Sequence, residues 1–396
     1  MKSAMTIVNY DPRLVKSKNP YPKGPNDWKR FFSFNTDAKV IGIQYIVTAL
    51  FFLLIGGLLA MLIRGELITP PSDLFDPTVY NGLYTMHGTI MLFLFLFPIL
   101  SGLTNLLVPP MIGAPDMAFP KLNALAFWLV PVFSIILLLS FFVPGGPASS
   151  GWWSYPPISI QNPLGQIING EMLWIIAISL SGISSIIGAV NFVTTIIRMR
   201  APGMGFFKMP IFIWTVLAAQ LLQLLGLPAL TGGAIMLFFD LTFGTSFFRI
   251  EGGGDPVLFQ HFFWFYSHPA VYVMVLPVFG IFSELFPVYS RKPLFGYKFV
   301  AVASFGITIL SLVVWVHHMF YTGTPMWMRN LFMFTTMLIA VPTGVKVFAW
   351  IATLWGGNIR LTTPMLFCLG GLFNFIFGGI TGVMLATVPV DIHVGN

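Results

Sequence analysis

About nine stretches of roughly 20 or more residues carry almost no charge, and these stretches limit the folds open to the chain. A helix of about 20 apolar residues spans a hydrocarbon core about 30 Å thick, and in lipid only helices and closed barrels satisfy their own backbone hydrogen bonds. The stretches run over residues 40–63, 84–108, 122–143, 171–197, 210–239, 257–287, 299–320, 330–355 and 364–388. The sequence therefore predicts an all-α fold, a polytopic transmembrane bundle of about nine helices.

The composition agrees with a membrane protein and argues against other classes. Hydrophobic residues make up 56% of the chain and charged residues 8%, whereas a soluble domain carries about 25% charged residues. The single cysteine, Cys368, excludes a disulfide framework and a cysteine-based metal site. The net charge of +7 does not indicate a nucleic-acid partner, because the basic residues are spread over loops on one side of the expected bundle.

Lys and Arg residues predict the orientation, because cytoplasmic loops are rich in them. If the N-terminus is cytoplasmic, nearly all of the 20 basic residues fall on that side. The exceptions are Arg64, Arg249 and Arg329 on the opposite side and Lys346 within a span. Several acidic residues also fall on the opposite side: Asp73, Asp76, Glu251 and Asp255. We therefore expect a multi-pass protein of a prokaryotic plasma membrane with a cytoplasmic N-terminus.

The whole chain, 1–396, is expected to form one integral membrane domain. Residues 1–39 are interpreted as a polar cytoplasmic lead-in, because their start lacks the apolar core of a cleaved signal peptide. Residues 40–388 hold the expected helices, and residues 389–396 form an extracytoplasmic end.

The stretch from Gln260 to Tyr272, QHFFWFYSHPAVY, places polar chemistry inside an apolar span. His268 and Tyr272 are four residues apart, so their rings lie on one helical face and within reach of each other. His317 and His318 lie together in another apolar stretch. Three imidazoles in a membrane are costly unless something holds them, and histidine-only ligation suits copper, zinc or iron. A neighbouring phenol is a source of an electron and a proton for oxygen chemistry.

Three motifs make the chain similar to subunit I of the haem-copper oxygen reductases: HPAVY (268–272), VHHMFYTGTP (316–325) and VPTGVKVFAW (341–350). The resemblance extends from about Asp37 to the C-terminus, through MHGTIMLFLFLFP (86–98), NLLVPPMIGAPDMAFPKLNALAFW (105–128) and GWWSYPP (151–157). It implies the catalytic subunit of a respiratory terminal oxidase, a cytochrome c or quinol oxidase. Such an enzyme reduces O2 to water at a haem-copper centre, and we expect it to be coupled to proton pumping.

The resemblance implies a set of ligands and cofactor contacts. His268, His317 and His318 would bind one copper ion, and Tyr272 would be covalently joined to His268. His87 would bind the low-spin haem, and Arg64 and Trp264 would be cofactor contacts.

Each residue taken alone has a simpler structural explanation. A lone membrane histidine is often only hydrogen-bonded to a neighbour, here Thr85 or Thr89 for His87, and Arg64 alone would be a snorkelling arginine.

Lys346 lies inside the eighth expected span, where a lysine costs a few kcal/mol, and its own span holds no carboxylate. The resemblance makes Lys346 part of the family's lysine-bearing proton route, together with Thr343, Ser283 and Tyr272.

Asp116 matches the mouth of the family's other proton channel, with Asn105 and Asn123 further along it, although each alone would be an ordinary loop cap. The chain also departs from the family pattern, because Ala270 stands where many members have a glutamate. Tyr266 and Ser267 resemble the subgroup that uses a Tyr-Ser pair instead. Two hydroxyls hold a water chain but do not store a proton as a carboxylate does.

The sequence ends at VPVDIHVGN, where family members continue into a tenth span. That span carries the axial histidine of the high-spin haem and the second ligand of the low-spin haem. Gly395 and Asn396 stand where many members have a His-Asp pair for a non-redox metal. The resemblance therefore implies a C-terminally truncated or split subunit, with the high-spin haem held by a histidine missing from this chain.

The expected partners follow from the same resemblance. They are oxidase subunits like subunits II and III, a companion C-terminal segment if the subunit is split, O2, and an electron donor that is a cytochrome c, a copper protein or a quinol. Two other functions stay open. A nitric-oxide reductase shares the scaffold with non-haem iron in place of copper, although Tyr272 and Lys346 count against it. A non-redox transporter or an inactive fragment would use the intramembrane lysine and histidines as substrate contacts.

Overall fold

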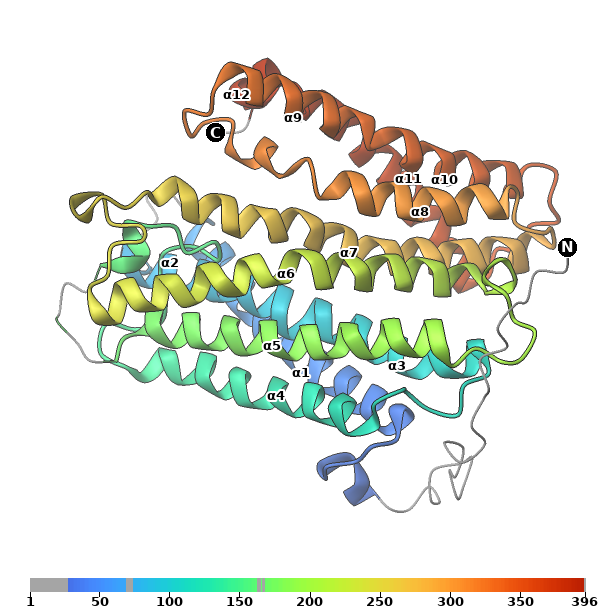
Figure 1. Ribbon diagram of the computed structural model, residues 1–396, viewed down its shortest axis with the longest axis horizontal. Helices are drawn as coiled ribbons and strands as arrows, with labels where there is room; N and C mark the ends of the chain where they lie inside the picture. The colour runs from blue at the N-terminus through green and yellow to red at the C-terminus, as the bar shows by residue number, and fades with distance from the viewer. Residues whose placement is uncertain (1–27, 69–73, 162–164, 166–167, 395–396) are drawn as a thin grey trace, which may run out of the picture.

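The computed structural model describes residues 28–68, 74–161, 165 and 168–394. Within these residues the regular elements are helices, which confirms the all-α class. Most of the expected lead-in, residues 1–27, lies outside the described residues, as do Asp73, Gly395 and Asn396. The main helices lie alongside one another and are roughly parallel in Figure 1.

Eight helical segments of the described residues are long and apolar enough to cross a membrane. The helices of these segments are α1 (Ala38–Glu66), α2 (Pro77–Thr89) continuing into α3 (Phe97–Ile112), α4 (Pro120–Leu139), α5 (Gly170–Arg198), α6 (Ile211–Phe243), α7 (Pro256–Ser290), α9 (Met326–Leu338) continuing into α10 (Ala340–Leu354), and α11 (Thr363–Leu385). The other two helices labelled in Figure 1 are not part of these segments: α8 (Tyr297–Ser311) and α12 (Val388–Val394).

The expected span 299–320 is a broken helix. Its regular part, α8, has 15 residues and a length of about 22 Å at 1.5 Å per residue, which is less than a bilayer core. After Ser311 the chain leaves the helix and then forms the 3₁₀ turn η8 (Trp315–Met319) before α9. Figure 1 shows this segment continuing beyond α8 along the bundle to the start of α9. The hydropathy of the stretch predicts its position but not its interruption.

Aspartates set the starts of several helices. Asp37, Asp76 and Asp255 precede α1, α2 and α7, and each carboxylate accepts the backbone N–H two residues later at 2.8 Å. Such caps satisfy one of the free N–H groups of the first turn and place negative charge at the positive end of the helix dipole. Gly113 ends α3 in a left-handed conformation (φ 71°), which a glycine adopts without strain.

The second crossing contains a π-helical segment, η3 (Ile90–Leu96), between α2 and α3. Phe97 donates its N–H to Leu92, five residues earlier, and Pro98 follows without an N–H to donate. A proline inside a helix removes one hydrogen bond and crowds the preceding turn, and a wider π turn accommodates both effects. The wide segment begins three residues after His87.

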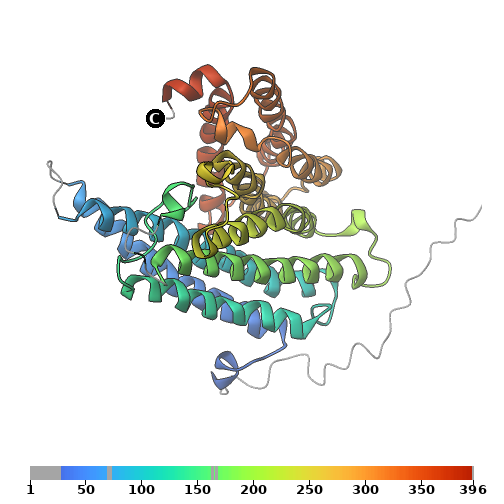
Figure 2. The same ribbon diagram turned by 60° about the vertical axis from the view of Figure 1, so that its left-hand side comes forward.

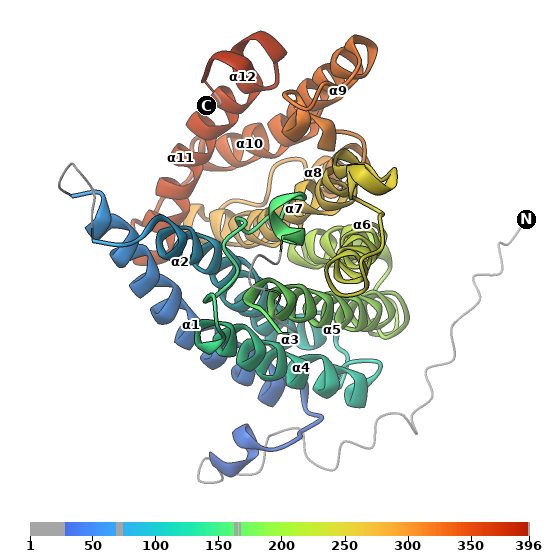
Figure 3. The same cartoon turned by 90° about the vertical axis from the view of Figure 1, so that its left-hand side faces the viewer.

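Helix α7 lies between an N-terminal and a C-terminal group of helices. In Figure 3 it lies between the group α1 to α5 and the group α8 to α11, and Figure 2 shows the same C-terminal group above the rest. Helix α6 packs closely against α7 through glycines. A Cβ atom at Gly233 would lie 2.9 Å from Phe262, and one at Gly226 would lie 3.4 Å from the carbonyl oxygen of Phe265. Small residues let membrane helices approach each other in this way.

Gly280→Ala is expected to destabilise the bundle. The added Cβ would overlap Thr215 Oγ1 and lie 2.9 Å from the Cα atom of Phe212, which is backbone and has little freedom to move. Overpacking of this kind costs about 1–3 kcal/mol, so thermal unfolding in detergent should occur at a lower temperature. Gly232→Ala is the matched control, because a Cβ there meets nothing within 4 Å. Equal unfolding temperatures for the two variants would contradict the close α6–α7 contact.

Candidate metal centre

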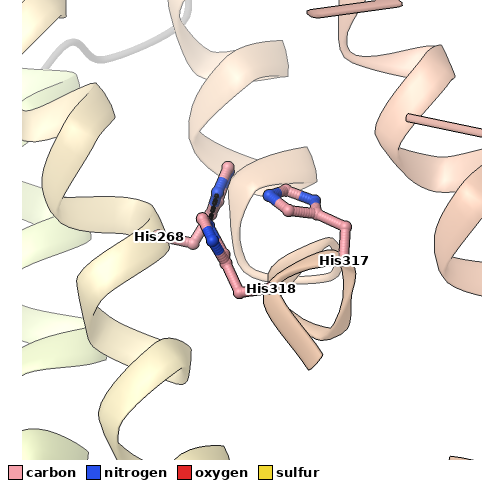
Figure 4. A group of neighbouring side chains, drawn as sticks. All are labelled: His268, His317 and His318. Carbon is pink, nitrogen blue, oxygen red and sulfur yellow. Dashed lines mark hydrogen bonds between the residues drawn. The ribbon is translucent and has the colours of Figure 1, made fainter. Parts of the chain in front are cut away.

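Three histidines from two elements meet in the C-terminal half. His268 comes from the middle of α7, and His317 and His318 come from η8. One ring nitrogen from each residue lies within 4.8 Å of the others, and His268 Nδ1 is 3.1 Å from His318 Nε2. Figure 4 shows the three rings pointing toward one another across the gap between α7 and the turn. The structure therefore brings together the three imidazoles that the resemblance assigns to copper.

After the break that follows α8, two neighbouring residues face one point. Successive side chains point about 100° apart on an α-helix and about 120° apart on a 3₁₀ turn, so neither regular geometry alone brings two adjacent imidazoles together. In η8 the ring centroids of His317 and His318 are 4.3 Å apart. Thr335 of α9 donates its hydroxyl to the carbonyl oxygen of Val313 at 2.8 Å, which satisfies a carbonyl that the interrupted helix leaves free.

A threonine of α9 orients His317. Thr336 Oγ1 donates to the carbonyl oxygen of Phe332 at 2.5 Å and lies 2.9 Å from His317 Nδ1. The hydroxyl has one hydrogen, which the carbonyl takes, so it accepts the Nδ1–H of the imidazole. This tautomer leaves a lone pair on Nε2 of His317, the arrangement found in metal-binding histidines.

The nitrogens of His268 fit a metal as well. Nδ1 faces His318, and Nε2 is buried with no hydrogen-bond partner. Two imidazole nitrogens bound to one ion, each about 2 Å from it, are separated by about 3 Å or slightly more, close to the 3.1 Å found between His268 and His318. A donor set of three imidazoles is suited to copper, zinc or iron. The residues present therefore fit a transition-metal ion.

Two aromatic side chains pack against the histidines. The ring of Tyr272 lies one turn along α7 from His268, with the centroids 5.0 Å apart. Trp264 stacks on His318 with centroids 3.8 Å apart and ring planes 5° apart, and its indole N–H donates to the Tyr155 hydroxyl. Burial raises the pKa of Tyr155 to about 12, so this phenol keeps its proton at neutral pH. Trp264 thus contacts a candidate metal ligand directly and ties it to the 151–157 loop.

A cavity of about 940 Å³ opens beside the histidines. Its lining includes all three histidines together with Tyr272, Thr336 and Thr343. This volume lies at the upper end of the range of about 300–1,000 Å³ for sites that bind small molecules and cofactors.

His87 of α2 has the orientation of a ligand at a second place in the bundle. Its Nδ1 lies 2.8 Å from the carbonyl oxygen of Gly56 in α1, and because a carbonyl only accepts, Nδ1 carries the hydrogen. Nε2 then keeps its lone pair. The threonines considered as partners bond elsewhere, since Thr85 donates to Asn81 and Thr89 donates to Thr85. Arg64 lies exposed in the last turn of the same α1 helix.

The model of the family described as Cytochrome C and Quinol oxidase polypeptide I matches residues 40–396. The chain belongs to the haem-copper oxidase subunit I family. It is 54% identical over 376 residues to "Cytochrome c oxidase subunit 1" of Thermostichus vulcanus and 55% identical over 367 residues to the protein of that name from Synechocystis sp.. A third relative of the same name, from Corynebacterium efficiens, is 45% identical over 376 residues.

The alignments cover 94%, 93% and 94% of this chain but 67%, 66% and 63% of the three relatives. The chain thus spans about two thirds of their length.

In this subunit I chain the candidate proton-carrying lysine has an unexpected neighbour. Lys346 is fully buried in α10, and its Nζ donates to Ser304 Oγ of α8 at 2.7 Å. Ser283, which the resemblance places on the lysine route, donates to the carbonyl oxygen of Phe279 at 2.7 Å and accepts the indole N–H of Trp350 at 2.9 Å. The hydrogen bonds of Lys346 therefore lead to α8 rather than to Ser283.

Thr343 lies one turn before Lys346 and lines the large cavity together with Tyr272. Its hydroxyl donates to the carbonyl oxygen of Ile339 at 2.9 Å. The structure thus places Thr343 and Tyr272 at one cavity, with the lysine amine on the α8 side of α10.

The second group of candidates lies at the ends of α1, α3 and α4. Asp116 is half-buried between α3 and α4 and accepts the N–H of Met117 at 2.7 Å and that of Ala38 at 3.2 Å. Burial raises the pKa of its carboxyl to about 6, against the opposing effect of these two N–H groups. Asn123 donates to Asn105 Oδ1 at 2.6 Å, and both asparagines line a cavity of about 40 Å³, which is room for water.

Several polar residues around these groups carry no signal in the sequence. Ser181, Ser184, Gln220 and Gln223 line the small cavity beside the asparagines. Tyr266, Ser267 and Ala270 are buried on α7. Thr336, Gly56 and Ser304 were also missed, because each acts through a neighbouring helix. No motif in the sequence links them to His317, His87 or Lys346.

Thr336→Val is expected to weaken metal binding by about 10- to 100-fold, the usual cost of removing a group that orients a ligand. Valine has nearly the shape of threonine but cannot accept the Nδ1–H of His317. Metal content at limiting copper, measured on the purified protein, tests this. Thr336→Ser keeps the hydroxyl and should retain the metal. Equal copper affinity in the valine variant would mean that His317 needs no partner or is not a ligand.

Proposed function

We propose that this chain forms the copper-holding part of the catalytic subunit of a respiratory terminal oxidase, which reduces O2 to water. The observation that carries the proposal is the meeting of His268, His317 and His318 beside Tyr272 at one large cavity. Three imidazoles with free lone pairs supply a site for copper, and the phenol supplies a proton and an electron beside it. Membership of the subunit I family favours this reading over transport.

The proposed cofactors are one copper ion and two haems. His268, His317 and His318 hold the copper, and His87 holds the low-spin haem through Nε2. The cavity of about 940 Å³ beside the histidines would hold the high-spin haem. When bound, copper and haem iron supply the redox chemistry, and the protein tunes it through ligands and surroundings.

The remaining residues hold and deliver protons. Tyr272, whose ring centroid lies 5.0 Å from that of His268, holds a phenolic proton and is covalently joined to His268 in the proposed enzyme. Lys346 and Thr343 supply protons to the cavity, and Asp116 accepts them at the mouth of the second route. Tyr266 and Ser267 replace a proton-storing glutamate, and we propose that pumping persists through a water chain held by their hydroxyls.

The proposed setting is a prokaryotic plasma membrane with a cytoplasmic N-terminus, supported by the distribution of Lys and Arg. The partners are subunits like II and III and an electron donor that is a cytochrome c, a copper protein or a quinol. Trp264 and Arg64 are proposed as cofactor contacts, Trp264 through its stacking on His318.

Optical spectra and metal analysis of the assembled enzyme test this function. The oxidase is expected to show haem bands and one copper ion per centre. His317→Ala leaves two imidazoles and should remove most of the copper while the low-spin haem at His87 stays. Haem with non-haem iron and no copper would favour a nitric-oxide reductase, and the absence of both metals would favour a transporter. Full copper content in His317→Ala would place the copper elsewhere.

Lys346→Met is expected to slow reduction of the high-spin haem by orders of magnitude while reduction of the low-spin haem stays fast. Negative charge added to a low-dielectric cavity is costly unless a proton comes with it, and Lys346 would supply that proton. Methionine has a similar length and removes the buried amine, so the protein should still fold. Stopped-flow reduction followed at both haems measures the two rates.

Asp116→Asn is the contrasting variant, since it should leave this reduction fast and impair pumping. Equal rates in Lys346→Met and the parent would show that the lysine is structural.

A further inference from the structure

The amine of Lys346 has a specific resting place. Its Nζ lies 2.7 Å from Ser304 Oγ and 3.4 Å from the carbonyl oxygen of Val300, both on α8. On a third side it lies over the ring of Phe279, 5.9 Å from the centroid. Lys346 and Ser304 are both 0% exposed, so neither side chain faces bulk solvent. No carboxylate forms a salt bridge with Lys346 in the part of the chain that the structure describes.

The direction of these hydrogen bonds is set by their chemistry. Ser304 Oγ donates its hydrogen to the carbonyl oxygen of Val300, at 3.0 Å, and so offers its lone pairs to the lysine. A protonated lysine has three donors and no acceptor, so the hydroxyl and the carbonyl together form an acceptor pair for it. The longer contact with Val300 is the weaker of the two, and Ser304 provides the main hydrogen bond.

This resting place is separate from the large cavity. Thr343, one turn before Lys346 on α10, lines the cavity with Tyr272, whereas the lysine amine lies against α8. A lysine that delivers protons to the cavity would have to leave Ser304 and move toward Thr343. Ser283 is not a partner of the amine in this structure: its hydroxyl donates to the carbonyl oxygen of Phe279 and accepts the indole N–H of Trp350.

We propose that Ser304 is the positioning residue of the lysine route: it holds the protonated amine of Lys346 on α8 between deliveries to the cavity. This inference rests on the proposed function for its kinetic consequence, but the contact between the two side chains does not. Ser304→Ala would leave the amine with the distant Val300 carbonyl alone, and a buried ammonium that lacks acceptors is costly. The protonated lysine would then be less populated, and the proton-coupled step would slow.

The kinetic test uses the assembled oxidase with Ser304→Ala, Ser304→Thr, Ser311→Ala and Lys346→Met. Ser304→Ala should reduce the high-spin haem at least about tenfold more slowly than the parent, because a hydrogen bond to a charged group is lost. Ser304→Thr keeps the hydroxyl and should restore the rate. Ser311→Ala is the matched control, since Ser311 is equally buried on α8 and donates only to its own helix, to Thr308. Copper content and low-spin haem reduction should be normal in all four.

A second measurement reports the contact without the redox reaction. A membrane-permeant amine reagent, followed by mass spectrometry, should label Lys346 more in Ser304→Ala than in the parent, Ser304→Thr or Ser311→Ala. A parental haem rate in Ser304→Ala alongside a slow Lys346→Met would overturn the positioning role and leave the lysine route standing. Unchanged labelling would overturn the resting place itself. If Lys346→Met is as fast as the parent, the route falls, and the labelling result alone decides whether Ser304 holds the lysine.

Discussion

The interior of this bundle depends on polar side chains finding partners on neighbouring helices, because lipid offers them none. His87 reaches across to the carbonyl oxygen of Gly56 in α1, and His317 reaches the hydroxyl of Thr336 in α9. Each contact satisfies one imidazole nitrogen and leaves the other free with a lone pair. The contacts that join the helices therefore also leave one nitrogen of each histidine able to bind a metal ion.

The interruption of α8 is the second condition for the site. The regular helix ends at Ser311, and the separate turn η8 carries His317 and His318 to the side of α7 where His268 lies. Because the helix is interrupted, the carbonyl oxygen of Val313 lacks a helical partner, and it accepts a hydrogen bond from the Thr335 hydroxyl instead. Helix α7 provides the opposite side with His268, and its close packing on α6 through glycines fixes where that histidine stands. The centre thus depends on one irregular turn held against one well-packed helix.

The sequence was sufficient for the fold class and for the histidines that meet, and the reasons are physical. Apolar stretches long enough to cross a bilayer have few alternatives to helices, and three histidines in such stretches need a common partner. The limits of α8 were not predictable, because hydropathy does not distinguish a helix from an apolar turn. Ser304 was also not predictable, because a serine that bonds to its own helix at Val300 looks the same in sequence as one that also accepts from Lys346.

The surroundings of the Asp116 carboxyl and of the Lys346 amine agree with the roles in proton transfer proposed for them. Asp116 lies near the end of the bundle, where two backbone N–H groups support its anion and burial raises the pKa of the carboxyl to about 6. A group of that pKa exchanges protons readily with water near neutral pH, which suits the mouth of a channel. Lys346 lies deep in the apolar interior, where a hydroxyl and a carbonyl are the acceptors within reach. An amine held by neutral oxygens can be released without separating an ion pair, and this makes a lysine without a carboxylate partner better suited to moving protons than to holding helices together.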